Sequence, residues 1–257
     1  PASQFLQNGD LRECDVEFGR RVGSSELVLE RGRQMDDGPI IVVSRGVAKR
    51  GRRDELIALL RLMTERDEQE SGTLLNAFLC ERDDQFVIWG LTIYSDPEAE
   101  NRHLSNVSQM LEQMEDLWEQ WPHPIYCVPL AAKVSDDLRD AWETEIDDGP
   151  VIIVSRGVAT HGRRDALFVL IRAMNEQDEQ EIGTLLHANQ HERDDPSVVW
   201  GLTVYRDVEA RNIHWKNLAP KLPSRDGLWE QWSHPIYCMP IAARISKELR
   251  DVYRASS

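Results

Sequence analysis

Imidazole and amide side chains gather on one segment in the second half of this 257-residue chain. The segment reads TLLHANQHE from Thr184, and side chains alternate along a strand, so His187, Asn189 and His191 share one face. Such a face could handle a proton or orient a ligand. Strand residues four apart lie about 13 Å apart, too far to share one metal ion. A solvent-facing edge is the alternative, and the sequence leaves both open.

The first half of the chain carries a different set on the same segment. TLLNAFLCE, from Thr73, places Asn76, Phe78 and Cys80 at the equivalent positions, which is a mixed and largely apolar set. We therefore expect any asymmetry of function between the halves to lie at this strand. The amide of Asn76 remains a candidate ligand contact in the first half.

The two segments belong to a duplicated unit. LWEQWPHPIYC from Leu117 returns as LWEQWSHPIYC from Leu228, an offset of 111 residues (228 − 117). The same offset lays DDGPIIVVSRGVA, from Asp36, on DDGPVIIVSRGVA, from Asp147, without a gap. A period this long, present twice, indicates a duplicated domain rather than a solenoid. We expect an N-terminal arm at 1–33, a first domain at 34–144 and a second domain at 145–257.

Patterning predicts the elements of one unit. Apolar, β-branched runs between turn residues predict four strands, at 39–47, 73–81, 86–94 and 123–130. Helical spacing predicts one helix at 54–70 and another that starts after Asp96 and continues towards Trp118 and Trp121. The acidic runs ERDEQE and EQDEQE are interpreted as solvated helix ends. The order β-α-β-β-α-β is a ferredoxin-like unit.

Two motifs add a family resemblance. Each unit has Glu-x-Gly-Thr-Leu, starting at Glu70 and Glu181, and aromatic-x-Asp-x-Glu-Ala, starting at Tyr94 and Tyr205, followed by a histidine on the next helix. With the element order, this resembles the antibiotic biosynthesis monooxygenase (ABM) family. The resemblance implies an α+β fold in which two ferredoxin-like units pair as a dimeric α/β barrel. The tandem repeat would supply both units as a pseudo-dimer within one chain, and a further homo-oligomer is left open.

The resemblance also implies an activity and its participants. Family members that oxidise polyketide aromatics use no metal or flavin, because the deprotonated substrate itself passes an electron to oxygen. The implied function is a cofactor-independent monooxygenase acting on a polycyclic, anthrone-type aromatic in secondary metabolism. A small aromatic substrate and molecular oxygen are then the expected partners. The protein must enclose the aromatic, accept its proton and stabilise the anion.

Candidate site residues follow from these requirements and from the family pattern. Where the family has an Asn and Trp pair on the third strand, each unit here has Gly and Tyr; the helix histidines and the first-strand serines match family pocket positions. The candidate catalytic residues are Tyr94, His103, His187, Tyr205 and His214. The candidate substrate-binding residues are Ser44, Asn76, Gly90, Trp118, Ser155, Asn189, His191, Gly201 and Trp229.

Other interpretations remain open. One is a non-redox protein of the same fold, either a ligand-binding accessory protein or an isomerase or cyclase, because duplicated domains are free to lose chemistry. Haem degradation, known in the wider superfamily, is disfavoured because Gln113 and Ser224 stand where an iron ligand would be. The LWEQW tryptophans either pack within the barrel or form a wall for a flat ligand. For Arg45 and Arg156 we favour structural pairing with a carboxylate.

Composition limits the partners further. The 30 basic and 45 acidic residues give a net charge of −15, which repels phosphate backbones and anionic lipid, so we expect no nucleic acid and no membrane partner. No apolar run approaches the roughly 20 residues that span a bilayer, and no signal-peptide pattern opens the chain. Cys14 and Cys80 have no counterpart in the other half, so the four cysteines do not suggest a disulfide framework. We expect a cytoplasmic protein.

Overall fold

The computed structural model describes residues 38–67, 70–143, 149–220, 227–232 and 235–254. The expected N-terminal arm (1–33), Cys14 and Ser224 lie outside these ranges. The domain boundaries at 34, 144 and 145 stay a prediction.

The first repeat has the predicted order of elements. They are β1 (Ile40–Ala48), α2 (Arg53–Asp67), β2 (Thr73–Glu81), β3 (Val87–Tyr94), α3 (Pro97–Met114), the 3-10 turn η1 (Glu115–Leu117), β4 (Trp118–Val134) and α4 (Leu138–Glu143). Helix α3 begins as its sequence predicts, since the Asp96 carboxylate accepts the Ala99 N–H at 2.8 Å and Pro97 is the first helical residue.

The second repeat has the same order, with its last strand in two parts. Its elements are β5 (Val151–Ala159), α5 (Arg164–Asp178), β6 (Thr184–Glu192), β7 (Val198–Tyr205), α6 (Val208–Leu218), β8 (Trp229–Trp232), β9 (Ile236–Ile245) and α7 (Leu249–Arg254).

One predicted boundary is wrong. The second helix of the first repeat ends at Met114, and both Trp118 and Trp121 lie on β4 instead. The reason is a tertiary contact. Trp118 pairs with Ala48 of β1, and its ring lies over Gly46, where a Cβ would come within 2.6 Å of ring carbon Cζ3. This contact favours the strand conformation over continuation of the helix.

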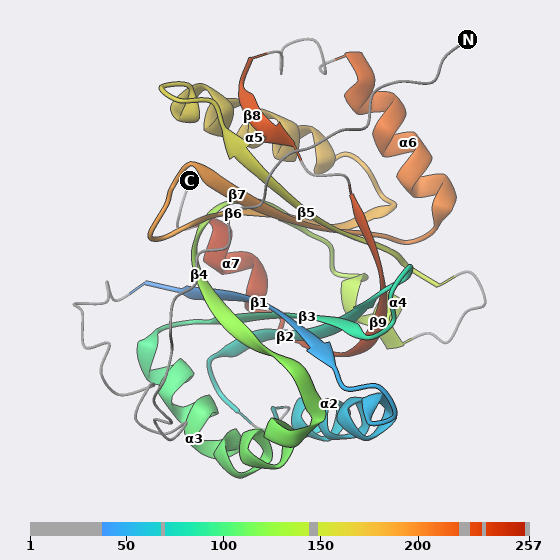
Figure 1. Ribbon diagram of the computed structural model, residues 1–257. Helices are drawn as coiled ribbons and strands as arrows, with labels where there is room; N and C mark the ends of the chain where they lie inside the picture. The colour runs from blue at the N-terminus through green and yellow to red at the C-terminus, as the bar shows by residue number, and fades with distance from the viewer. Residues whose placement is uncertain (1–37, 68–69, 144–148, 221–226, 233–234, 255–257) are drawn as a thin grey trace, which may run out of the picture. The chain divides into compact units, whose positions relative to one another are not determined.

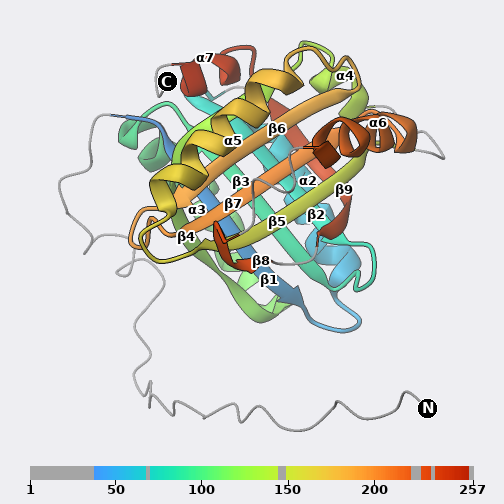
Figure 2. The same ribbon diagram turned by 90° about the horizontal axis from the view of Figure 1, so that it is seen from above.

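The strands of both repeats form one sheet that closes on itself (Figures 1 and 2). The order is β7-β6-β4-β1-β3-β2-β9-β5-β8, and β7 also pairs with β5. Closure depends on β4 and β9, each of which pairs with strands of both repeats. β4 extends past β1 to pair with β6, from Cys127↔Glu192 to Val134↔Leu186, and β9 correspondingly pairs with both β5 and β2. The expected fold class, two ferredoxin-like units paired as a barrel within one chain, is confirmed.

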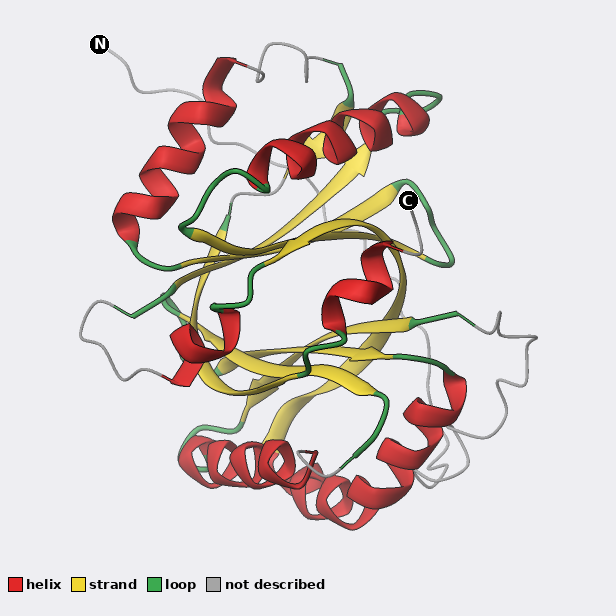
Figure 3. Ribbon diagram, turned by 180° about the vertical axis from the view of Figure 1, so that it is seen from behind, coloured by secondary structure: helices red, strands yellow, loops and turns green. Residues whose placement is uncertain are grey.

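The inward side chains of both repeats share one apolar core. Trp89 and Trp200 belong to this core and meet there edge to face, with ring centroids 5.7 Å apart. The short helices α4 and α7 each follow the last strand of their repeat (Figure 3). Their residues Leu138 and Leu249 belong to the same core. Helices α2 and α3 lie outside the first repeat's strands, and α5 and α6 outside those of the second (Figure 1). Among the described residues, no helix has the length and apolarity needed to cross a bilayer.

Candidate functional site

Each repeat buries a histidine against two carboxylates between its sheet and its second helix. In the first repeat, Nδ1 of His103 on α3 lies 2.9 Å from Oε2 of Glu70 and 3.2 Å from Oδ1 of Asp67. Asn106, one turn further along α3, donates to Oε1 of Glu70 at 2.8 Å. His103 is only 4% exposed, so its charge is held by the carboxylates rather than by water.

The chain brings these carboxylates together at the end of the first helix. Asp67 is the last residue of α2, and Glu70 lies in the short connection to β2. Gly72 makes this connection possible, because its φ of +91° is unfavourable for residues with a side chain. Thr73 then donates its hydroxyl to Glu70 at 3.2 Å and orients the carboxylate towards α3.

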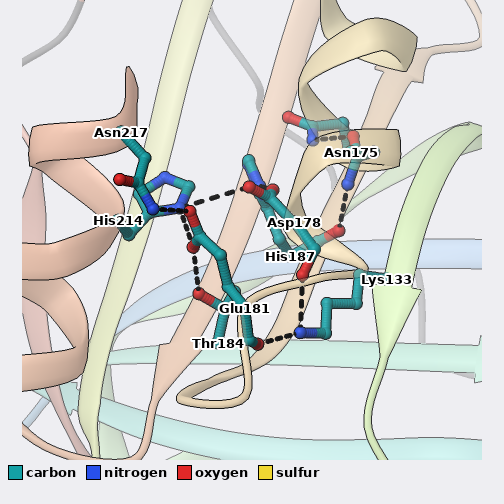
Figure 4. A network of polar contacts seen from close by, with 9 residues as sticks. Lys133, Asn175, Asp178, Glu181, Thr184, His187, His214 and Asn217 are labelled. Atoms are coloured by element: carbon teal, nitrogen blue, oxygen red, sulfur yellow. Dashed lines mark hydrogen bonds and ion pairs between the residues drawn. The ribbon is translucent and has the colours of Figure 1, made fainter. Parts of the chain in front are cut away.

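The second repeat has the same constellation (Figure 4). Nδ1 of His214 on α6 lies 2.9 Å from Oε2 of Glu181 and 3.3 Å from Oδ1 of Asp178. Thr184 and Asn217 donate to Glu181, each at 2.9 Å.

The two constellations differ at one position on the second strand of each repeat. In the first repeat the amide of Asn76 donates to Asp67. In the second repeat the imidazole of His187 takes this place, with Nδ1 hydrogen-bonded to Asp178. The rings of His187 and His214 stand edge to face with centroids 5.5 Å apart. Asp178 therefore lies between two imidazoles, whereas Asp67 has one.

The electrostatics of the clusters follow from this geometry. Burial alone would lower the pKa of His103 and of His214, but hydrogen bonds and charge from the neighbouring carboxylates outweigh it and raise both values. Burial opposes ionisation of Asp178, yet hydrogen bonds from His187 and His214 lower its pKa to about 2. Both clusters are therefore ion-pair networks at neutral pH.

The third-strand tyrosines lie against the helix histidines. The ring of Tyr94 is 5.5 Å from that of His103, and the ring of Tyr205 is 5.3 Å from that of His214. Burial raises the pKa of both phenols well above the ordinary value. Both phenols therefore stay protonated at neutral pH and their rings pack on the clusters, and the catalytic role of Tyr94 and Tyr205 stays a prediction.

The donor atoms of each cluster are close enough to be considered for metal binding. Those of Asp178, His187 and His214 lie within 4.8 Å of one another, as do those of Asp67, Glu70 and His103. In both groups the carboxylate oxygens and the Nδ1 atoms lie in hydrogen bonds or ion pairs within the cluster, although Oδ1 of Asp67 has only the ion pair with His103 and no hydrogen bond among the described residues. We interpret both groups as hydrogen-bonded ion-pair networks.

A basic residue from the opposite repeat supports each cluster. Lys133, on the part of β4 that pairs with β6, donates its ammonium to the carbonyl of Asp178 at 2.6 Å and to that of Glu181 (Figure 4). Arg244 of β9 donates to the carbonyl of Glu70 at 2.9 Å. Each carboxylate turn is thus held by a strand that crosses over from the other half.

A hollow adjoins the cluster of the second repeat. Its cavity volume is about 50 Å³, and it lies between strands β5, β6 and β7, helix α5 and strand β8. Five candidate residues line it, namely Ser155, His187, Asn189, Gly201 and Trp229. Trp232 completes the aromatic side, with its ring centroid 4.7 Å from that of Trp229. His187 therefore belongs both to the buried network around Asp178 and to the lining of the hollow.

In the first repeat an aromatic ring occupies the corresponding place. Phe78 stands at the position of Asn189, and its Cε1 lies 3.5 Å from a Cβ built on Gly90, the counterpart of Gly201. Phe78 packs against the apolar cluster between the first sheet and α2 and α3. Trp118, the counterpart of Trp229, is a member of that cluster. The serine hydroxyls of both repeats lie over these glycines, at 2.6 Å from the built Cβ.

The strand with which the sequence analysis opened is covered rather than exposed. His187 is 8% exposed and Asn189 is 9% exposed, so the solvent-facing alternative is wrong for both. The reason is that β6 lies between β7 and β4 and is covered by α5. His191, at the end of β6, instead stacks on Phe168 with centroids 5.2 Å apart.

The buried carboxylates of the clusters were not predicted from the sequence. The runs ERDEQE and EQDEQE were expected to be solvated, but Asp67 and Asp178 within them are buried. The available signal was that Asp and Glu recur three residues apart in both copies, at 67 and 70 and at 178 and 181. The expected pairing of the strand arginines is confirmed, since Arg45 lies 3.5 Å from Glu81, and Arg156 lies 3.9 Å from a carboxylate oxygen of Glu192.

Comparison with known proteins identifies the fold. No family model matches the sequence, and no curated protein matches it. Among solved structures, a putative monooxygenase from Lactobacillus acidophilus aligns with a TM-score of 0.70 and 15% identity, over 81% of this chain and 96% of its own. A putative monooxygenase from Fusobacterium nucleatum gives a TM-score of 0.73 and 15% identity, over 82% and 96%. An anthrone oxidase-like protein aligns with a TM-score of 0.52 and 9% identity, over 83% of this chain and 95% of its own.

Identities this low show the fold alone. The resemblance expected from the motifs is confirmed at that level, and the chain has a monooxygenase-like fold built from two ABM-like units in tandem.

Proposed function

We propose that the protein is a cofactor-independent monooxygenase that oxidises a polycyclic, anthrone-type aromatic in the hollow of the second repeat. The activity would belong to secondary metabolism in the cytoplasm, a setting that suits the free, buried cysteines Cys80, Cys127 and Cys238. The observation that carries the proposal is the position of His187. It lines an aromatic-walled hollow, and its Nδ1 is bonded to a buried carboxylate.

The groups around the hollow meet the needs of this reaction. With Nδ1 of His187 held by Asp178, Nε2 is the ring nitrogen left to accept a proton from a phenol or an acidic CH₂ group. The indole N–H of Trp229 is buried and has no hydrogen-bond partner among the described residues, so it can donate to the resulting anion. Gly201 allows the Ser155 hydroxyl to approach the strand closely beside the hollow, because a Cβ there would lie 2.6 Å from Oγ of Ser155.

The stoichiometry balances with oxygen alone. The substrate loses a proton to His187 and an electron to O₂. One oxygen atom then enters the substrate as a carbonyl, and the other leaves as water with the two hydrogens of the CH₂ group. The protein supplies the proton acceptor, the hydrogen bonds to the anion and the enclosure.

Oxygen uptake with a reduced anthrone, without added metal or flavin, tests the proposal. His187→Asn gives the second cluster the composition of the first and should lower kcat roughly 10²- to 10⁴-fold, the usual contribution of a general base. Asn189→Phe should close the hollow as Phe78 does in the first repeat, and so prevent binding. The matched control is Phe78→Leu, which lies in the other repeat and should leave the rate within about twofold.

Two results would contradict the proposal in different ways. Wild type that binds the aromatic, seen by quenching of tryptophan fluorescence, but consumes no oxygen above buffer would favour the non-redox alternative, a binding protein or an isomerase or cyclase. Full activity in Asn189→Phe would show that the reaction does not take place in this hollow.

A further inference from the structure

The two imidazoles on Asp178 have different surroundings. His214 faces two carboxylates, since Glu181 lies 2.9 Å from the same nitrogen that faces Asp178. His187 is bonded to Asp178 alone and borders the hollow. Both rings are buried, so the charge of either is felt strongly by the other.

Other charged or titratable groups face this pair from the neighbouring elements. Lys133 of β4 is the strand partner of His187, and its ammonium bonds the carbonyls of Asp178 and Glu181. Tyr205 of β7 packs on His214. Arg156 of β5 lines the same hollow as His187. Lys133 therefore opposes a further positive charge on the His187 ring, whereas the charge of Arg156 is paired with Glu192 at 3.9 Å.

We propose that His214 holds the one proton that the two imidazoles share, and that its positive charge keeps His187 neutral. Two bases on one carboxylate take up protons in separate steps, and the first proton goes to the ring with more negative neighbours. That ring is His214, whose pKa is raised by Asp178 and Glu181 against the effect of burial. His214 is thus a positioning residue, and His187 stays able to accept a proton from substrate.

That His187 accepts a proton from substrate rests on the proposed function, whereas the sharing of one proton between His187 and His214 does not. The first repeat lacks such a pair, because Asn76 stands in place of His187 and an amide cannot take up a proton. It therefore serves as an internal comparison.

NMR titration of the imidazole signals tests the proposal without any substrate. In His214→Gln, which keeps a hydrogen-bond donor but no charge, the midpoint of the His187 signals should move to higher pH by about one unit or more. The matched variant His103→Gln in the first repeat should leave it in place. An unchanged midpoint in folded His214→Gln would overturn the proposal.

A second variant tests the proposal even if His214→Gln does not fold. Asn76→His installs the missing imidazole beside Asp67, and the rings at 76 and 103 should then titrate in two separate steps. Independent titration of the two rings would count against the proposal.

The pH dependence of activity is a measurement that a purely structural role of His214 would not change. In His214→Gln the acid limb of the pH–rate profile for oxygen uptake should shift to higher pH, in the same direction as the NMR midpoint. A lower rate with an unshifted limb would overturn the role in catalysis. If no aromatic supports uptake, the proposed function fails while the NMR result still decides the proton sharing.

Discussion

Lys133 offers a direct test of how the first repeat supports the second repeat's site. Lys133 is 5% exposed, and its ammonium donates to two carbonyls that flank the turn from α5 to β6. Hydrogen bonds from a charged donor contribute about 1.5–3 kcal/mol each, and a buried carbonyl left without its partner costs about 1–3 kcal/mol. Burial of the ammonium offsets part of this, and the lowered pKa of Lys133 reflects that cost.

We therefore expect Lys133→Met to lower the free energy of unfolding by about 2–4 kcal/mol. For a unit of this size that corresponds to a Tm lower by about 5–15 °C. Chemical and thermal denaturation measure the loss, and amide hydrogen exchange should become faster in the turn between Asp178 and Thr184. Lys216→Met, an exposed lysine on α6, is the matched control and should change stability by less than about 0.5 kcal/mol. A loss for Lys133→Met no larger than this control would refute the reasoning.

Three further predictions concern stability. The lowered pKa of Asp178, about 2 against 3.8, stabilises the fold above pH 3.8 by about 2 kcal/mol, and this contribution is lost as pH falls towards 2. The raised pKa values of His103 and His214 stabilise the fold below pH 6.5, and that contribution is lost as pH rises through the raised values. Urea midpoints should therefore be highest between pH 3.8 and 6.5, and a midpoint that does not change with pH would contradict the ion pairs. Gly157→Ala should destabilise by about 1–3 kcal/mol and alter tryptophan fluorescence, because its Cβ would overlap the Trp229 ring, whereas Gly38→Ala, with open space around it, should do neither. Gln190→Leu should raise the free energy of unfolding by about 1–3 kcal/mol, because Oε1 of this buried side chain has no hydrogen-bond partner among the described residues and Leu79 stands at the equivalent position of the first repeat. An unchanged or lower denaturation midpoint would show that the amide is hydrogen-bonded.

The sequence by itself determined the repeat, the order of elements and the faces of the strands. These follow from local patterns: the 111-residue offset, the alternation along each strand, and the Asp96 cap that starts α3. The same alternation placed His187, Asn189 and His191 on one face of their strand. Identity of the LWEQW string in both copies indicated shared packing, which the contact of Trp118 with Gly46 explains for the first copy.

Only the tertiary structure decided what meets at the site. His214 lies 33 residues from Glu181, and Lys133 lies 45 residues from Asp178 in the other repeat, so no local pattern predicts their contact. These meetings depend on β4 extending past β1 to pair with β6, a register set by closure of the whole barrel. The surroundings of Gly90 and Gly201 depend likewise on packing. The ring of Phe78 lies 3.5 Å from a Cβ built on Gly90, whereas Oδ1 of Asn189, which lines the hollow, lies 3.3 Å from one built on Gly201.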